Sequence, residues 1–588
     1  MTAALVLATC VAAFAQGLGR IDFPTSGSPE AQPHFLRGVA ALHNFEYDEA
    51  VDAFRSARRL DPRFAMAYWG EALAHHSVLT SSSDAAGGRA ILRQLGATRD
   101  ARLARARTDK EHGFIEAVDA LFGEGDEAAR QRAYVAAMER LRAQYPNDNE
   151  VASFYALALL DTAIRATYGL SAAPSEGHRH HQLAGSDTQQ RAGEILRRVL
   201  QRNPEHPGAA HYLLHTYDDF EHAARALDVA RIYARIAPES SHARHMPAHI
   251  FVQLGLWQEA AASDEAASRA ADASRARGGL DESRTDYHPL TWLQYERLQL
   301  GQFAAAREMV ESMQAAAART GSELLKNHAA SMRSRYVLEA GRWELLRDAD
   351  DFGNLDELVA IGISAARGAN VERADQVREL FVRLASGGGS SAIAPALTVM
   401  EREIAALVHV AAGRTTDAIE ALRAAADAER ALPTGMGPPR PIKPAHELLG
   451  EVLLEFGRAS EARDAFERAL QRHPNRSASV LGLARAVAAS GDRALAARHY
   501  ATFVGNWTQA DGDRPELAEA RRGVDAAETW TVTFFRGFPG KKVIVPVLLA
   551  LAATAIGMWA RRRRRGAQPA TERRTGARAT RSRTRSGR

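Results

Sequence analysis

The sequence predicts an all-α protein, a solenoid of helix–turn–helix repeats that ends in a single transmembrane helix. The chain is rich in Ala, Leu, Glu and Arg, which favour helices, and it lacks the Val/Ile/Thr-rich alternation typical of strands. Residues of one kind also recur at a fixed interval: His211 and His215 are followed 34 residues later by His245 and His249. Such a period is typical of stacked helical hairpins, each burying its apolar face on its neighbours.

The repeat register is clearest in a unit that starts at Lys443. Its positions 7, 8, 11, 15, 20, 24, 27 and 32 hold Leu449, Gly450, Leu453, Gly457, Ala462, Phe466, Ala469 and Pro474. One period later the same kinds of residue return as Leu483, Ala484, Val487, Gly491, Ala496 and Tyr500. Similar spacings predict further repeats that start at Ala31, Pro207 and Ser241.

This pattern resembles the tetratricopeptide repeat, which has small or apolar residues at positions 8 and 20 and larger apolar ones at 7, 11 and 24. The body also resembles a group of uncharacterised bacterial secreted tetratricopeptide proteins, in the segments 206–212, 245–251 and 474–476. The resemblance implies a fold and no established activity. We expect repeats over residues 31–431 and 445–529, joined by a Pro/Gly-rich linker over 432–444, with a generic helical bundle as the alternative.

The two ends of the chain predict that the body is exported and anchored. Residues 2–15 are mostly apolar and end in Ala13-Phe14-Ala15, which indicates a signal peptide over residues 1–15; the alternative is an apolar cap on the first helix. Val543–Ala560 is an uncharged segment long enough to span a bilayer core of about 30 Å. Five arginines follow directly, so the positive-inside rule predicts a cytoplasmic tail and an extracytoplasmic (periplasmic or extracellular) body in the cell membrane.

The formal net charge of +4 averages unlike segments. The tail, residues 561–588, carries twelve arginines and one glutamate, a charge of +11, so the rest of the chain carries −7. We expect the tail to be disordered, and the acidic body argues against a nucleic-acid partner. The single cysteine, Cys10, lies in the predicted signal peptide, which leaves the mature body without a disulfide or a thiolate metal site.

The matched histidines define the candidate site. In the repeat register, His211 and His245 occupy position 5, and His215 and His249 occupy position 9. Positions 2, 5 and 9 share one face of a helix, which resembles the ligand-lining surface of the concave groove in tetratricopeptide proteins. The predicted groove also includes position 2 of three repeats and one aspartate beyond position 9. Its lining residues are His211, His215, Asp218, His242, His245, His249, His288 and His328.

Three interpretations of this face stay open. In the first it binds a transition metal such as Zn, Cu or Fe, because imidazole suits these metals and a carboxylate can complete the set, or it serves in general base catalysis, because histidine titrates near neutral pH. The ligands would be His211, His215, His245 and His249, with His242, Asp218 or His288 as further candidates. In the second the face binds a protein or peptide, and in the third the histidines are copies left by duplication that only pack.

Pro247 affects this geometry. A proline inside a helix removes a hydrogen bond, so the helix is expected to begin near Pro247 and to leave His245 in front of it. The pairing of His245 with His249 would then be loose.

The function we predict from the sequence is a membrane-anchored, extracytoplasmic scaffold that binds a protein or peptide in its groove. The alternative is a metal-binding protein or a metal-dependent enzyme that uses the histidine cluster. The chain has no His-Glu-x-x-His, Gly-x-Ser-x-Gly, P-loop or dinucleotide-binding motif, so the catalytic residues are unknown and enzymatic activity stays open. The expected partners are a protein or peptide and, through Val543–Ala560, the membrane.

Overall fold

The computed structural model describes residues 17–537, except for residues 79–83, 168–186, 280, 387–392, 434 and 513. The predicted signal peptide (1–15), the predicted transmembrane segment (543–560) and the basic tail (561–588) lie outside the described residues. Among the helices that are described, none combines the length and the apolar character needed to cross a membrane.

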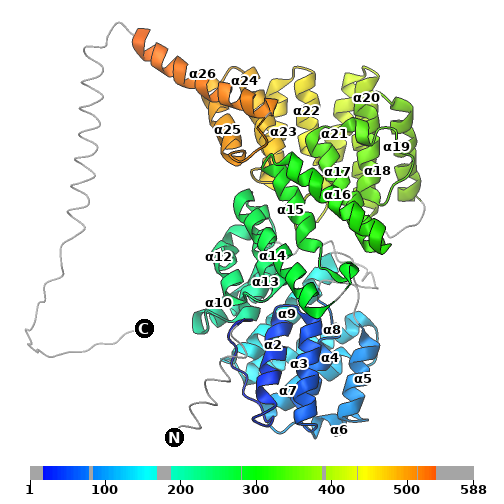
Figure 1. Cartoon of the computed structure of the whole chain (residues 1–588), viewed down its shortest axis with the longest axis vertical. Coiled ribbons are helices and arrows are strands. Elements are labelled where there is room, and N and C mark those ends of the chain that lie inside the picture. The colour runs from blue at the N-terminus through cyan, green and yellow to red at the C-terminus, as the bar shows by residue number, and fades with distance from the viewer. Residues whose placement is uncertain are drawn as a thin grey trace, which may run out of the picture. The chain divides into compact units, whose positions relative to one another are not determined.

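The described part of the chain is helical and contains no β-strand, as the sequence predicts (Figure 1). The first compact unit ends at Val524, within the last helix. The elements of the N-terminal half are α2 (Gln32–His43), α3 (Tyr47–Leu60), α4 (Ala65–Leu73), α5 (Ala85–Leu95), α6 (Arg99–Leu103), α7 (Asp109–Leu121), α8 (Glu127–Gln144), α9 (Asn149–Thr167), α10 (Asp187–Arg202), α11 (Pro207–Thr216), η1 (Ala223–Ala226), α12 (Leu227–Ile236), α13 (Ser241–Gln253) and α14 (Trp257–Gly278). Those of the C-terminal half are η2 (Glu282–Arg284), α15 (His288–Gln299), α16 (Phe303–Thr320), α17 (Glu323–Ala340), η3 (Trp343–Leu345), α18 (Leu355–Arg367), α19 (Val371–Ser386), α20 (Ala394–Ala411), α21 (Thr415–Arg430), α22 (Ala445–Glu455), α23 (Ala459–Arg472), α24 (Ser477–Ala489), α25 (Arg493–Asn506) and α26 (Pro515–Gly537).

The predicted repeats coincide with helical hairpins. The starts at Ala31, Pro207, Ser241 and Lys443 correspond to the pairs α2–α3, α11–α12, α13–α14 and α22–α23. Within each pair the apolar positions of the repeat are buried, as Leu449, Leu453 and Phe466 are in α22–α23. Successive hairpins pack on one another, so the fold grows by local stacking.

Two large apolar cores divide the first unit. One runs from Leu18 to Leu300 and the other from Leu298 to Ala520, so the change falls within α15. The segment 432–444, predicted as a linker, joins α21 to α22, which pack against each other. It also lies against the first core, because the Gly435 carbonyl accepts a hydrogen bond of 3.2 Å from Gln253 Nε2.

A close approach of two turns ties the cores together next to the candidate site. Gly255, between α13 and α14, has a φ of 66°, and a Cβ there would lie 2.2 Å from the Pro474 carbonyl oxygen. The Asn475 amide donates to the Gly255 carbonyl at 2.8 Å, and the Trp257 indole donates to the Asn475 carbonyl at 2.8 Å. Glycine is therefore required at position 255 both for its backbone conformation and for lack of space.

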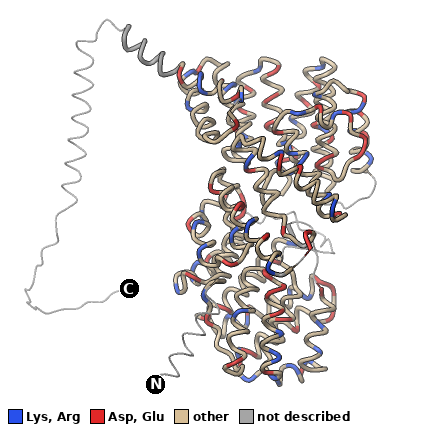
Figure 2. Tube along the Cα trace, viewed as in Figure 1, with Lys and Arg blue, Asp and Glu red and all other residues tan. Residues whose placement is uncertain are grey.

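Charged residues of both signs are interspersed along the described helices (Figure 2). Most of their ion pairs join neighbouring turns or neighbouring helices at the surface, where each contributes little to stability. A different situation holds at Arg476, which is buried and pairs with Glu447 and Glu339. Arg476 belongs to the segment 474–476, one of the segments that carry the family resemblance. Its buried ion pairs give that segment a structural role.

Candidate metal centre

Three helices bring six histidines together. His211 and His215 lie on α11, while His242, His245 and His249 lie on α13, and His288 is the first residue of α15. Helix α11 begins at Pro207, where the His206 side chain accepts a hydrogen bond from the Ala209 amide. Helix α13 begins at Ser241, and the side chain of Ser240 caps it in the same way by accepting from the Ala243 amide.

The first triad consists of His211, His215 and His242. The Nε2 atoms of His215 and His242 each lie 3.0 Å from Nε2 of His211. The ligand atoms of all three residues lie within 4.8 Å of one another. His211 and His215 are buried and His242 is partly exposed, so this set of nitrogens is close to the surface on one side only.

The second triad consists of His245, His249 and His288. The Nε2 atoms of His245 and His249 lie 3.1 Å apart, and the ring of His288 lies 4.8 Å from that of His245. Here too the ligand atoms lie within 4.8 Å of one another. Two of its members are buried and His288 is exposed, so each triad has one residue near solvent.

The two triads adjoin. Ring centroids are 6.0 Å apart between His215 and His249 and 6.4 Å apart between His242 and His245. Aromatic rings flank the pair: Phe45 lies 4.4 Å from the His211 ring, and Trp292 lies 4.3 Å from the His249 ring. The six imidazoles therefore form one continuous cluster with apolar walls.

Hydrogen bonds on the far nitrogens orient three of the rings. His211 Nδ1 donates to the His43 carbonyl at 2.6 Å. His249 Nδ1 lies 2.6 Å from a carboxylate oxygen of Asp218, and His245 Nδ1 lies 2.5 Å from one of Asp264. An acceptor on Nδ1 directs the lone pair of Nε2 toward the cluster, which is the usual way in which proteins prepare histidine as a metal ligand.

The surroundings keep five of the six histidines uncharged at neutral pH. Burial, followed by the mutual repulsion of neighbouring imidazoles, holds the pKa of His211, His215, His242 and His245 well below the usual histidine value. His288 has exposed surface, yet the protein packed around its ring, followed by the imidazole of His249, lowers its pKa to about 3. Neutral imidazole is the form that coordinates metals, so the site is ready to bind without first losing protons.

The structure places the predicted residues as follows. It brings His211, His215, His242, His245, His249 and His288 together, whereas the partly exposed His328 lies on α17 outside both triads. Asp218 contacts the Nδ1 side of His249 and is not among the converging Nε2 atoms. It also does not continue the helix face beyond His215, because α11 ends at Thr216.

The expectation that α13 begins near Pro247 is wrong. The helix begins six residues earlier, at Ser241, and Pro247 lies inside it. The cap by Ser240 secures the first turn, and Ser263 donates a hydrogen bond of 2.5 Å to the Arg244 carbonyl within that turn. His245 and His249 are consequently on one regular helix and their rings lie 4.8 Å apart.

Sequence reasoning missed Asp264 and the partners of the first triad. Asp264 occupies position 24 of the repeat that starts at Ser241, where Phe54 and Phe466 stand in other repeats. An acidic residue at a buried apolar position is the signal that could have identified it. The contribution of the His43 carbonyl and the wall formed by Phe45 come from a distant helix hairpin and have no local sequence signal.

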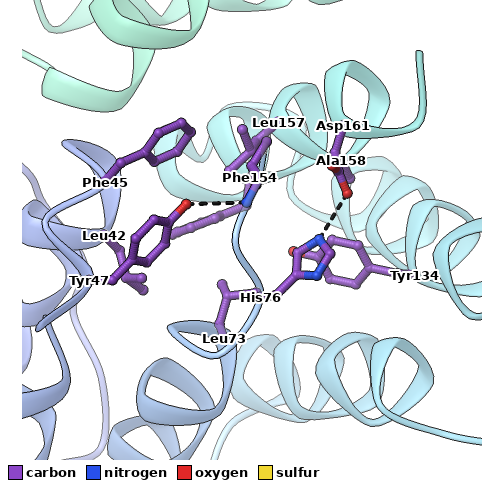
Figure 3. A pocket seen from close by; sticks show the side chains of 11 residues that line it. Leu42, Phe45, Tyr47, Leu73, His76, Tyr134, Phe154, Leu157, Ala158 and Asp161 are labelled. Atoms are coloured by element: carbon purple, nitrogen blue, oxygen red, sulfur yellow. Dashed lines mark hydrogen bonds and ion pairs between the residues drawn. The ribbon is translucent and has the colours of Figure 1, made fainter. Parts of the chain in front are cut away.

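A small pocket is lined by residues of the first apolar core (Figure 3). Phe45 lines this pocket and also contacts His211. Within it, His76 Nε2 lies 2.8 Å from an Asp161 carboxylate oxygen, and the Tyr47 hydroxyl accepts from the Val78 amide at 3.3 Å. His76 was given no role from the sequence, and its buried hydrogen bond with Asp161 is sufficient to account for it.

A family model described as tetratricopeptide repeat matches residues 29–79, 405–477 and 447–511. These segments coincide with helical hairpins at the two ends of the repeat array and do not include α11 to α15, which hold the triads. Tetratricopeptide repeats are scaffolds suited to binding other proteins. No curated protein matches the chain significantly.

Several solved structures match most of the chain at low similarity. Cut9 in the Cut9–Hcn1 hetero-tetramer of the APC/C is 11% identical, over 89% of this chain and 81% of that one, with a TM-score of 0.30. Human IFIT1 in a dimer with m7Gppp-AAAA is 11% identical, over 85% and 94%, with a TM-score of 0.32. Yeast Tom70 is 11% identical, over 87% and 92%, with a TM-score of 0.21. At these scores the likenesses carry no information about function.

Proposed function

We propose that this tetratricopeptide-repeat protein binds two transition-metal ions, one in each histidine triad, and acts as a metal-binding or metal-dependent catalytic protein. The hydrogen bonding of His211 carries the proposal. Its Nδ1 proton is used by a backbone carbonyl, which can only accept, so a neutral His211 presents a lone pair at Nε2. Both His215 and His242 place their Nε2 atoms 3.0 Å from that lone pair. One lone pair accepts only one N–H hydrogen bond well, whereas a metal cation can be coordinated by all three nitrogens.

The separations fit metal ligation. Nitrogens bound to one ion at about 2.1 Å lie about 3.0 to 3.4 Å apart, depending on whether the geometry is octahedral or tetrahedral. The observed Nε2 separations of 3.0 and 3.1 Å fall at the near end of this range. In the second triad, the carboxylate of Asp218 behind His249 would add negative charge that favours a cation, and the carboxyl group of Asp264 behind His245 would do so once a bound ion favours its ionised form.

Three histidines per ion leave a coordination position open, as in catalytic zinc sites. An ion held in this way supplies an activated water molecule or a Lewis acid. In this chain His242 and His288 are the members closest to solvent, so a substrate would approach from their side. Phe45 and Trp292 would exclude water from the opposite walls.

Binding of a protein or peptide along the predicted groove is the second candidate function. The repeat scaffold favours it, and so does the exposure of His288 together with the partial exposure of His242 and His328. On this interpretation the buried histidines would only support the surface that the partner contacts. We further propose that the body is extracytoplasmic and anchored by Val543–Ala560, on the sequence evidence of an apolar span followed by five arginines.

Metal analysis of the purified full-length protein tests the proposal. We expect about two transition-metal ions per chain, one per histidine triad, as the ligand sets imply. His211→Ala and His249→Ala should each lose the ion of its own triad, because removing one of three ligands weakens the whole set. His112→Ala, an exposed histidine on α7, is the matched control and should retain both ions.

A protein that contains no metal and shows no affinity for added Zn, Cu or Fe would rule out the proposal. In that case the same variants should be examined for loss of a peptide partner, which the second candidate requires.

A further inference from the structure

A buried arginine without a counter-ion lies next to the second triad. Arg335, on α17, is 7% exposed. Among the residues that the structure describes, no carboxylate lies within ion-pair distance of Arg335, and its Nε has no hydrogen-bond partner. Burial lowers the pKa of Arg335, and the carboxylates of Glu339 and Asp356 are close enough to oppose that shift, but both have other partners. Glu339 pairs with Arg476, and Asp356 accepts a hydrogen bond from Ser331 at 2.8 Å. A buried guanidinium is costly unless an anion accompanies it.

The helix that carries Arg335 packs against the helix that carries His288. Helices α15 and α17 pack together, and Gln294 Nε2 on α15 donates to the Met332 carbonyl on α17 at 3.1 Å. His328 lies seven residues before Arg335, two turns away on the same face of α17. After burial and the nearby imidazole of His249, the charges of His328, Arg335 and Arg440 further lower the pKa of His288.

Arg440 adds a second positive charge from the segment 432–444. It is exposed and forms no ion pair with a described residue. Its segment is held against the site, because Gly437 packs on Trp292, whose ring lies 5.5 Å from that of His288. Arg335 and Arg440 thus provide positive charge near His288, and His328, whose pKa is lowered by burial and then by these two arginines, adds an uncharged imidazole.

We propose that Arg335, assisted by Arg440 and His328, binds an oxyanion, a carboxylate or phosphate group, of the molecule that approaches the second triad. This inference rests on the proposed function and specifies its substrate class. Guanidinium suits both groups, because its parallel N–H donors match two oxygens of either one. An anion held at Arg335 would place the adjoining part of the substrate against the open side of the His288 triad.

Calorimetric titration of the full-length protein with inorganic phosphate and with acetate tests the inference. Each titration is performed on the protein as purified and on chelator-treated protein. Arg335→Met should weaken binding of the preferred probe by about tenfold or more, since a charge-assisted contact of about 1.5 to 3 kcal/mol is lost. Arg440→Met should weaken it less. Arg333→Met, on the same helix and paired with Glu357, should bind as the wild type does.

The outcomes separate this inference from the proposed function. Tighter binding of phosphate or of acetate identifies the oxyanion. If metal is retained but both probes bind equally to wild type and Arg335→Met, or bind to neither, the inference is wrong and the metal centre stands. If metal is absent but anion binding depends on Arg335, the metal centre is wrong and the anion site stands.

Discussion

Single polar residues at apolar repeat positions carry most of the information about the site. Asp264 replaces the large apolar residue of position 24 and contacts His245 at 2.5 Å. Burial, and then the neighbouring Glu296, raise the pKa of Asp264 well above its usual value. A metal ion on His245 would oppose that shift, because a nearby cation favours the carboxylate. The arrangement is costly for folding alone, which agrees with a ligand-binding role.

Buried acids outside the site predict a pH-dependent stability. Glu429 on α21 is 2% exposed, and burial raises its pKa to about 7. The folded protein therefore binds this proton more tightly than the unfolded chain. The stability it contributes is fully present below the unfolded pKa of about 4.3 and is lost as the pH rises through 7.

Glu429→Gln should remove this dependence while retaining the hydrogen bond from the Ala445 amide. At pH 8 the variant should be more stable than the wild type by about 3 kcal/mol at most, and at pH 4 the two should be equal. Thermal unfolding midpoints at both pH values measure the difference, and Glu420→Gln, at an exposed position on the same helix, is the control. Parallel pH profiles for Glu429→Gln and the wild type would contradict the assignment.

Pairs of repeats share one packing device, a phenylalanine clamped between two glycines. Phe54 is clamped by Gly38 and Gly70, where added Cβ atoms would lie 2.7 and 2.3 Å from its ring. Phe466 is clamped in the same way by Gly450 and Gly482, at 2.8 and 2.3 Å. The phenylalanine lies sixteen residues from each glycine in both cases. Neighbouring hairpins can approach closely only because these helix positions have no side chain.

Gly482→Ala should destabilise the C-terminal repeats by about 1 to 3 kcal/mol, because the methyl group would overlap the Phe466 ring in a core with no spare volume. Gly505→Ala is the matched control, since a Cβ at this exposed position of α25 meets no atom within 4 Å and alanine favours the helix. Urea unfolding of both variants measures the effect. Equal destabilisation of the two, or none for Gly482→Ala, would be inconsistent with the clamp.

At the scale of the whole molecule, the two apolar cores meet near the candidate site. Trp292 on α15 contacts the second triad, while Leu298 on the same helix belongs to the second core. The segment 432–444 crosses back to contact Gln253 and Trp292. Parts of the chain 182 residues apart thus meet beside the site, so that ligand binding there depends on the packing of both cores.

The proposed topology makes a prediction for the intact protein in cells. A reporter fused after Arg588 should be cytoplasmic, and protease added outside the membrane should digest the repeat body, because the arginines 561–565 hold the tail inside. Replacing these five arginines with serine should weaken the orientation, whereas replacing the distal arginines of the tail should not. A body protected from external protease in intact cells would contradict this topology.

The sequence by itself determined the repeat architecture, because a helical hairpin that stacks on its neighbours shows its apolar positions at a fixed local period. It also identified His211, His215, His245 and His249 as neighbours, together with His242 and His288, since they share helix faces in consecutive repeats. The tertiary structure alone decided which nitrogens converge, because the acceptors that orient them come from elsewhere: the His43 carbonyl from the first repeat and Asp264 from the far side of its own hairpin. It also placed Arg335 and Arg440 beside His288, because contacts between distant repeats depend on how the hairpins stack and leave no periodic trace in the sequence.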